Sequence, residues 1–201
     1  MNRDRWKLVL SFILLGSGAI LSLQGIRILL ESHVGQTAAA RDFRAANFST
    51  KPKSTLGRPP LRGQIMALLT IPRLTTELYV IEGDGNDELR RGPGHLADSA
   101  MPGSRGNCVI AGHRDTHFRI LHQIRKGDDI DVSTDAGTFS YRVDNISVVS
   151  PSNTASLRPS DRSVLHLVTC YPFSYVGSAP QRLVVEANLA PPSAQVQAKT
   201  K

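Results

Sequence analysis

VLHLVTCYP, residues 164–172, is an almost uninterrupted apolar run that closes on a cysteine and a proline. Branched and aliphatic residues with few charges are typical of a strand that is buried on both faces. Pro172 cannot donate to a sheet ladder, so we expect the strand to end close to it. The run therefore predicts a central strand with the thiol of Cys170 at its exit, where a nucleophile can perform acyl transfer if an imidazole and a guanidinium lie nearby.

Short strands separated by turn residues surround this run from residue 64 onward. No long amphipathic helix separates them, and the only helical candidates are two short segments, residues 87–91 and 118–124. This pattern favours an all-β barrel or sandwich over a βαβ sheet. The expected strands cover residues 65–71, 78–82, 107–111, 130–134, 137–149, 164–169 and 182–189.

The charge of the chain is concentrated outside this β region. The formal net charge is +7, but residues 1–62 and the last three residues together carry +9, so residues 63–198 carry −2. A basic face on the folded part is therefore not expected, and nucleic acid is not a predicted partner. The length of 201 residues suits one domain with an additional segment.

The N-terminal segment predicts a membrane anchor. Residues 8–26 contain no charge and follow Arg3, Arg5 and Lys7. A helix of this length rises about 28 Å, close to the roughly 30 Å hydrocarbon core of a bilayer. Because basic residues stay on the cytoplasmic side, we expect a single-pass protein of the cell membrane with a cytoplasmic N-terminus and the remaining chain outside. A cleaved signal peptide would export the domain equally, but the small residues 38–40 lie far beyond the apolar run, so we favour an uncleaved anchor.

The composition along the chain divides it into five segments. We expect a cytoplasmic tail over residues 1–7, the anchor over 8–30, a linker over 31–62, the catalytic domain over 63–190 and a flexible tail over 191–201. The linker is rich in proline and glycine after a helical start at residues 37–48. Its positive charge places it either near anionic lipid headgroups or free in solvent.

Three separated blocks carry a resemblance to a known family. They are VIAGHRDTHF (109–118), LVTCYPF (167–173) and APQRLVV (179–185), preceded by GPGH (92–95) and MPG (101–103). In this order the blocks resemble the sortase family, and most of all its class D, for which TCYPF followed by YVGSAP and an arginine is typical. The resemblance covers residues 64–189 and the layout of anchor and linker. It implies an eight-stranded sortase-type β-barrel with short helices.

The resemblance also implies an activity. Sortases are cysteine transpeptidases that cut an LPXTG-like sorting signal of a protein substrate through a thioester and transfer the acyl fragment to an amine acceptor. The acceptor is a peptidoglycan stem or another protein. On this resemblance Cys170 is the nucleophile and His113 carries the proton to the leaving amine. Arg182 then holds the oxyanion or the carbonyl groups of the substrate with its fixed positive fork.

Residues around the expected nucleophile are candidates for binding the substrate. Thr169 either contacts the substrate or caps the strand, and the backbone N–H of Tyr171 is a second candidate oxyanion donor. Ser174, Tyr175 and Gly177 lie in the segment between Cys170 and Arg182 and are expected to form a wall of the groove. Asp115 either orients the imidazole of His113 or lines the groove.

Other interpretations of these residues remain open at the level of sequence. A disulfide between Cys108 and Cys170 would silence the nucleophile in an oxidising compartment. His113, His117 and His122 are weakly suggestive of a metal site, but Arg114 stands where a zincin carries its glutamate. We therefore expect no metal and no required cofactor, while an activating Ca²⁺, as some relatives use, stays open. A non-catalytic exported β-domain, or another exported cysteine acyltransferase, is the alternative function.

Overall fold

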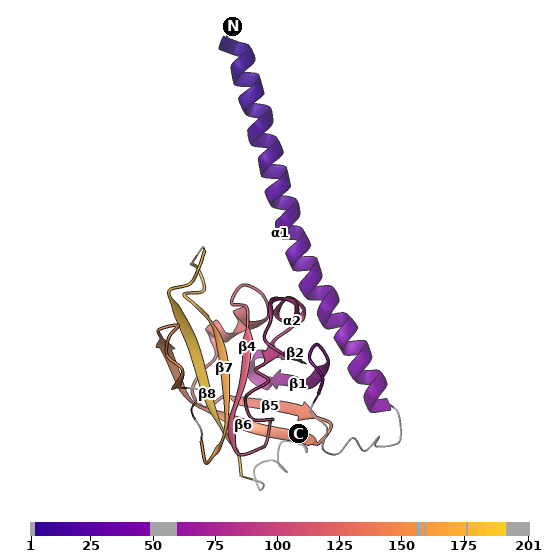
Figure 1. Cartoon of the computed structure of the whole chain (residues 1–201), viewed down its shortest axis with the longest axis vertical. Coiled ribbons are helices and arrows are strands. Elements are labelled where there is room, and N and C mark those ends of the chain that lie inside the picture. Colours follow the sequence, from indigo (N-terminus) through magenta and orange to yellow (C-terminus); the bar gives the residue numbers. More distant parts are fainter. Residues whose placement is uncertain (1–2, 49–59, 156–157, 159, 176, 192–201) are drawn as a thin grey trace.

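The apolar run forms β7 (Ser163–Tyr171) in the computed structural model, which describes residues 3–48, 60–155, 158, 160–175 and 177–191. β7 lies between β4 (Gly106–Gly112), to which it is parallel, and β8 (Gln181–Leu189), to which it is antiparallel (Figure 1). Leu165 and Leu167 are fully buried in the core. The prediction of a buried central strand is confirmed.

The strands close into a barrel. Their order is β1-β2-β3-β4-β7-β8-β6-β5, and antiparallel pairing of β5 with β1 completes the ring. The eight-stranded barrel and both short helices that the sequence predicts are therefore confirmed. The remaining elements are β1 (Ile65–Ile71), η1 (Pro72–Leu74), β2 (Thr76–Glu82), α2 (Asn86–Arg91), β3 (Gly94–His95), η2 (His117–Gln123), β5 (Asp129–Thr134) and β6 (Gly137–Val149).

β3 is the strand that the pattern of residues does not predict. It has two residues, which is too short to show an alternation of apolar and polar side chains. A buried polar contact holds it in place: His95 is 1% exposed, and its Nδ1 lies 2.8 Å from the carboxylate of Glu82 on β2. β3 thereby connects β2 to β4, the strand that leads to His113.

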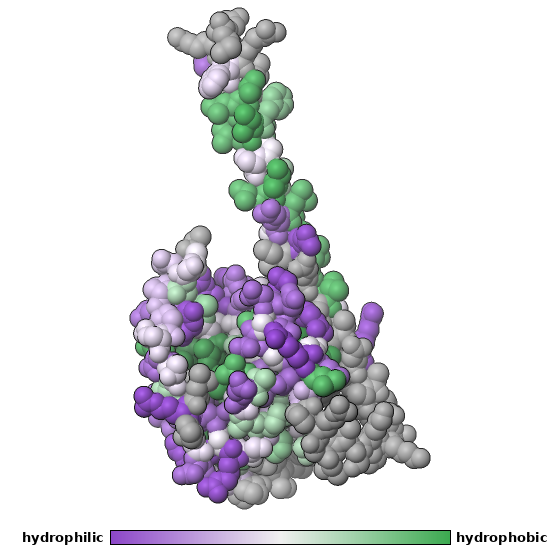
Figure 2. Space-filling view, viewed as in Figure 1, coloured by the Kyte–Doolittle hydropathy of each residue, from purple (hydrophilic) through white to green (hydrophobic). Residues whose placement is uncertain are grey.

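α1 (Arg3–Phe48) is one long helix that runs past the barrel (Figure 1). Within it, Val9–Arg27 is long and apolar enough to cross a membrane, and none of this window is buried inside the chain. Figure 2 shows these apolar side chains on the part of the helix that projects beyond the barrel. The helix continues through residues 31–48, where the sequence predicts a linker, because this stretch lacks proline and contains several alanines. Residues 49–59 and 192–201, which belong to the predicted linker and tail, lie outside the described residues.

The side chain of Gln36 links the second half of α1 to the barrel. The amide nitrogen of Gln36 donates to the carbonyls of Tyr79 (3.2 Å) and Arg91 (2.9 Å), and its oxygen accepts the N–H of Tyr79 (2.8 Å). This amide therefore pairs with β2 as a neighbouring strand would. Gly92 leaves the room for it, since a Cβ there would lie 2.5 Å from the Gln36 nitrogen. We call this contact the Gln36 clamp.

Candidate active site

Three neighbouring strands bring the predicted catalytic residues to one end of the barrel. Cys170 on β7 is the direct register partner of Arg182 on β8. On the other side of β7, Gly112 at the end of β4 pairs with Thr169, and His113 follows Gly112 directly. The register of the sheet thus places His113 and Arg182 on opposite flanks of the cysteine.

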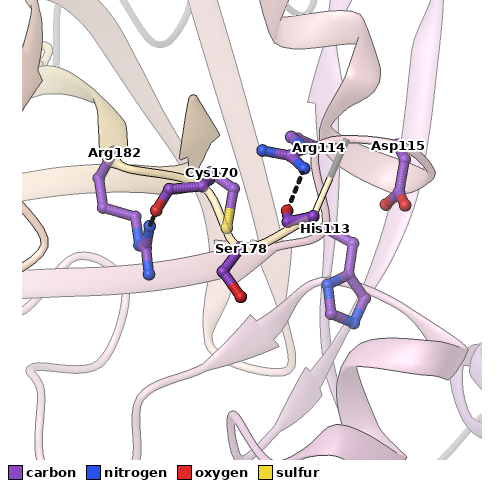
Figure 3. A pocket seen from close by; sticks show the side chains of 8 residues that line it. His113, Arg114, Asp115, Cys170, Ser178 and Arg182 are labelled. Carbon is purple, nitrogen blue, oxygen red and sulfur yellow. Dashed lines mark hydrogen bonds between the residues drawn. The ribbon is translucent and has the colours of Figure 1, made fainter. Parts of the chain in front are cut away.

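These side chains line one open cavity of about 300 Å³. Its walls come from the ends of β4 and β7, from the β7–β8 loop and from the start of β8. Figure 3 shows Cys170 between Arg182 and His113. The lining residues are His113, Arg114, Asp115, Cys170, Gly177, Ser178, Ala179 and Arg182.

The turn that carries His113 is fixed by packing and by hydrogen bonds. The ring of Phe118, which is fully buried, packs so closely on Gly112 that a Cβ there would lie 2.7 Å from it. The N–H of Phe118 donates to the carbonyl of His113 (3.0 Å). The hydroxyl of Thr169 donates to the carbonyl of Gly112 at 2.7 Å. The backbone of His113 is therefore held from both sides before any substrate binds.

Arg114 holds the β7–β8 loop over the cavity. Its Nη2 donates to the carbonyls of Tyr175 (2.6 Å) and Gly177 (2.8 Å), and its guanidinium lies over the Tyr175 ring at 5.8 Å from the centroid. The sequence alone does not predict this role for Arg114. Its position next to His113 in the sequence indicates that it lies near the site. Its contacts with residues more than sixty positions away depend on the folded barrel and cannot be predicted from the sequence.

Arg182 supplies positive charge beside the thiol. Its Nη1 donates to the carbonyls of Ala179 (3.2 Å) and Gln181 (3.0 Å), which orients the guanidinium along the loop. No ion pair with an acidic residue engages Arg182 in the part of the chain that the structure describes. A guanidinium without a carboxylate partner can stabilise negative charge that develops on a substrate oxygen.

The two thiols have different environments. Burial raises the pKa of the Cys108 thiol to about 12, whereas Cys170 is half-buried at the cavity. Both cysteines are free. Cys108 pairs with Leu165, five positions before Cys170 on β7, so the two cysteines are about 16 Å apart along the sheet. This separation is far beyond the reach of a disulfide, and the pairing that the sequence left open does not form.

The predicted substrate-binding residues are not brought to the cavity as a group. Thr169 is 2% exposed and points into the barrel, so its hydroxyl positions Gly112 and does not line the cavity. The Tyr171 ring packs edge-on against Phe173. Ser174 and Tyr175 are exposed on the loop, while the loop residues that line the cavity are Gly177, Ser178 and Ala179. Of the residues predicted to form a wall of the groove, Gly177 lines the cavity and Ser174 and Tyr175 do not, and their role in binding substrate stays a prediction.

The other histidines of the weak metal motif do not line the cavity. His117 begins η2 and is 9% exposed, and His122 Nδ1 lies 2.6 Å from the carbonyl of Arg119 on the same element. Within the described residues, no three His, Cys, Asp or Glu side chains are grouped so as to hold a metal ion.

Residues 69–190 match the family model described as a sortase domain, and this match includes β4, β7, β8 and the whole cavity. The chain belongs to the sortase family. Sortases are cysteine transpeptidases, and this sortase therefore belongs to that class of enzyme.

Known relatives support the predicted resemblance to class D. The chain is 36% identical over 140 residues to Sortase D of Bacillus subtilis, covering 69% of this chain and 71% of the relative. It is 37% identical over 129 residues to Sortase SrtE1 of Streptomyces coelicolor, covering 55% of this chain and 37% of the relative. The solved structure of a Clostridium perfringens Sortase D5 transpeptidase superposes with a TM-score of 0.65 at 30% identity, covering 80% of this chain and 99% of that one.

Proposed function

We propose that this sortase is a membrane-anchored transpeptidase that cleaves an LPXTG-like sorting signal and transfers the acyl fragment to an amine. The acceptor in this proposal is a peptidoglycan stem or another protein. The observation that supports it most is the register of β4, β7 and β8, which brings His113, Cys170 and Arg182 to one cavity.

Cys170 acts as the nucleophile in this mechanism. Its thiolate attacks the carbonyl carbon of the sorting-signal threonine, and a tetrahedral intermediate forms with negative charge on the oxygen. Collapse of the intermediate breaks the peptide bond and leaves a thioester on Cys170. His113 donates a proton to the departing amine and then accepts one from the incoming amine, which attacks the thioester and releases the thiolate.

Arg182 stabilises the intermediate. It lies beside Cys170 through the register of β7 and β8, and its guanidinium has no carboxylate partner among the described residues. A preoriented cation next to a developing oxyanion can lower the barrier more than the same charge in water. The backbone N–H of Tyr171 remains the second donor that we predict.

The anchor is the N-terminal part of α1. Its apolar window, Val9–Arg27, is exposed along its whole length, and Arg3, Arg5 and Lys7 precede it. These basic residues favour a cytoplasmic N-terminus and a catalytic domain outside the membrane, with lipid as the partner of the exposed helix.

Incubation of the full-length protein in detergent micelles with an LPXTG peptide and hydroxylamine tests the proposal. Mass spectrometry should detect the threonyl hydroxamate and the released C-terminal fragment. Cys170→Ala should abolish turnover, while Cys108→Ala, which removes the other thiol, should retain it. Arg182→Lys should reduce kcat by roughly a hundredfold, because an ammonium cannot reproduce the planar fork. Turnover by Cys170→Ala would contradict the mechanism, and the absence of turnover with every such peptide would contradict the substrate.

A further inference from the structure

A second cavity lies on the outer face of the sheet, beneath the segment that crosses from β6 to β7. Its volume is about 180 Å³, and it is separate from the catalytic cavity, with which it shares no lining residue. Its walls are polar and come from the crossing segment, β4, β7 and β8. They consist of Asn107, Ala155, Arg158, Ser160, Arg162, Val164, His166 and Glu186.

Hydrogen bonds to the carbonyls of Arg158 and Arg162 hold these two residues of the crossing segment in place and leave their guanidinium groups available. The side-chain amide of Asn107 donates to the carbonyl of Arg158 (2.6 Å), and the N–H of Gly106 donates to the carbonyl of Arg162 (3.0 Å). In the described ranges, neither Arg158 nor Arg162 has a side-chain hydrogen bond or ion pair. Two positive charges therefore line the cavity without a partner in the protein.

The floor of this cavity contains an unsatisfied buried atom. His166 on β7 and Glu186 on β8 are direct register partners, so their side chains lie next to each other on one face. His166 is 6% exposed, and its Nδ1 has no hydrogen-bond partner. Burial lowers the pKa of His166, an effect that the nearby Glu186 charge opposes. A buried polar atom without a partner is costly, and a ligand that enters the cavity can supply the missing contact.

The cavity lies on the same strand face as the nucleophile. Leu165, Leu167 and Thr169 are buried in the barrel, so the alternating positions His166 and Cys170 share the outer face of β7. Four residues of strand separate them by about 13 Å. His113 flanks Cys170 on the side of β4. The crossing segment begins on the other side, after Val149 of β6, which pairs with Arg182. In the proposed reaction the leaving amine lies near His113. The acyl part of the substrate is then expected to extend from Cys170 along β7 toward His166.

We propose that the second cavity binds an acidic side chain of the polypeptide substrate, four residues on the N-terminal side of the residue that is joined to Cys170. An extended peptide of four residues spans the same distance of about 13 Å. Arg158 and Arg162 bind the carboxylate, and Nδ1 of His166 together with Glu186 pairs with polar groups of the same peptide segment. With one glutamate against two arginines, the cavity carries a net positive charge and selects an anion. This inference rests on the proposed function, and for an LPXTG-like signal the acidic residue stands directly before the leucine.

Peptides that differ only at this position test the inference. With full-length protein in detergent micelles, glutamate before the LPXTG core should give a kcat/KM about tenfold above glutamine, through KM, and lysine should be the poorest substrate. The double variant R158Q/R162Q should raise KM for the glutamate peptide about tenfold and remove the preference. R158E/R162E should prefer lysine. Arg125→Gln, which removes an exposed arginine that lines neither cavity, is the matched control and should keep the preference of the wild type.

Binding to the Cys170→Ala variant separates this inference from the proposed function. Fluorescence anisotropy should show that the glutamate peptide binds about tenfold more tightly than the glutamine peptide, and that this difference shrinks as salt is added. If peptides are cleaved but glutamate and glutamine differ by less than twofold, the cavity does not select an acidic residue and the transpeptidase assignment stands. If no peptide is cleaved but the binding preference is present, the cavity is supported and the proposed reaction is wrong. Equal binding of both peptides overturns the inference.

Discussion

Burial should separate the reactivities of the two thiols by about three orders of magnitude. Burial in the barrel raises the pKa of Cys108 from an ordinary value of 9.0 to about 12. At neutral pH the thiolate fraction of a cysteine falls tenfold for each unit by which its pKa rises. The thiolate fraction of Cys108 is therefore about a thousandfold lower than that of an ordinary thiol. Cys108 is also only 1% exposed, which blocks access of a reagent. Cys170 is half-buried at an open cavity.

Iodoacetamide labelling of the full-length protein at pH 7.5, followed by mass spectrometry of its peptides, measures this difference. We expect Cys170 to be labelled at least about a thousandfold faster than Cys108. In urea both thiols should react at similar rates, which serves as the control for intrinsic reactivity. In Cys170→Ala the folded protein should resist labelling. If the labelling rates of Cys108 and Cys170 in the folded protein differ by less than tenfold, the reasoning is refuted that burial protects Cys108 and that the cavity leaves Cys170 reactive.

Three further substitutions test how the site and the barrel are held. Thr169→Val removes the donor to the Gly112 carbonyl and should cost about 1–3 kcal/mol of unfolding free energy in urea titrations; an unchanged midpoint would show that the bond contributes nothing. Arg114→Gln releases two loop carbonyls and should raise KM about three- to tenfold with a smaller change in kcat, as steady-state kinetics would show. The Arg73 hydrogen bond lowers the pKa of Asp128, so this carboxylate contributes stability above the unfolded pKa of about 3.9 that is lost as pH falls through the folded pKa. The Tm difference between wild type and Asp128→Asn should therefore be full at pH 5–7 and narrow below about pH 4, and a constant gap down to pH 2 would contradict this.

Seven of the eight strands were predictable because each of them has its own local signal. The apolar run at residues 164–172 and the alternation of apolar and polar residues over 139–144 can both be recognised without knowledge of the neighbouring strands, and turn residues mark the ends of these strands. β3 was not predictable, because two residues carry no period, and its place depends on the contact between His95 and Glu82. The expectation of a closed eight-stranded barrel came from the resemblance to sortases, and the order of the strands was not predicted, since pairing between distant segments is not encoded in any one of them.

The sequence predicted the proposed reacting groups that line the cavity, and it was less informative about the residues that support them. Cys170, His113 and Arg182 stand in recognisable blocks, and the fold brings them to one cavity. Thr169 stands next to the cysteine in sequence, but the alternation of a strand turns its side chain to the opposite face. Arg114 contacts a loop that only the closed barrel brings near it. Adjacency along the chain therefore predicts adjacency in space poorly within a strand.

The Gln36 clamp gives the proposed anchor a mechanical role. Gln36 is nine residues beyond Arg27, the last residue of the apolar window, and the helix between them is continuous. If the window spans the bilayer, the clamp fixes the barrel about 14 Å farther along the helix and at one azimuth around it. Insertion of one residue between these positions would turn the barrel by about 100° around the helix axis and move it by about 1.5 Å along that axis. The height of the catalytic cavity above the lipid and the direction in which it faces would then depend on the length of the helix. Only sorting signals that their own proteins hold at that height would reach the cavity.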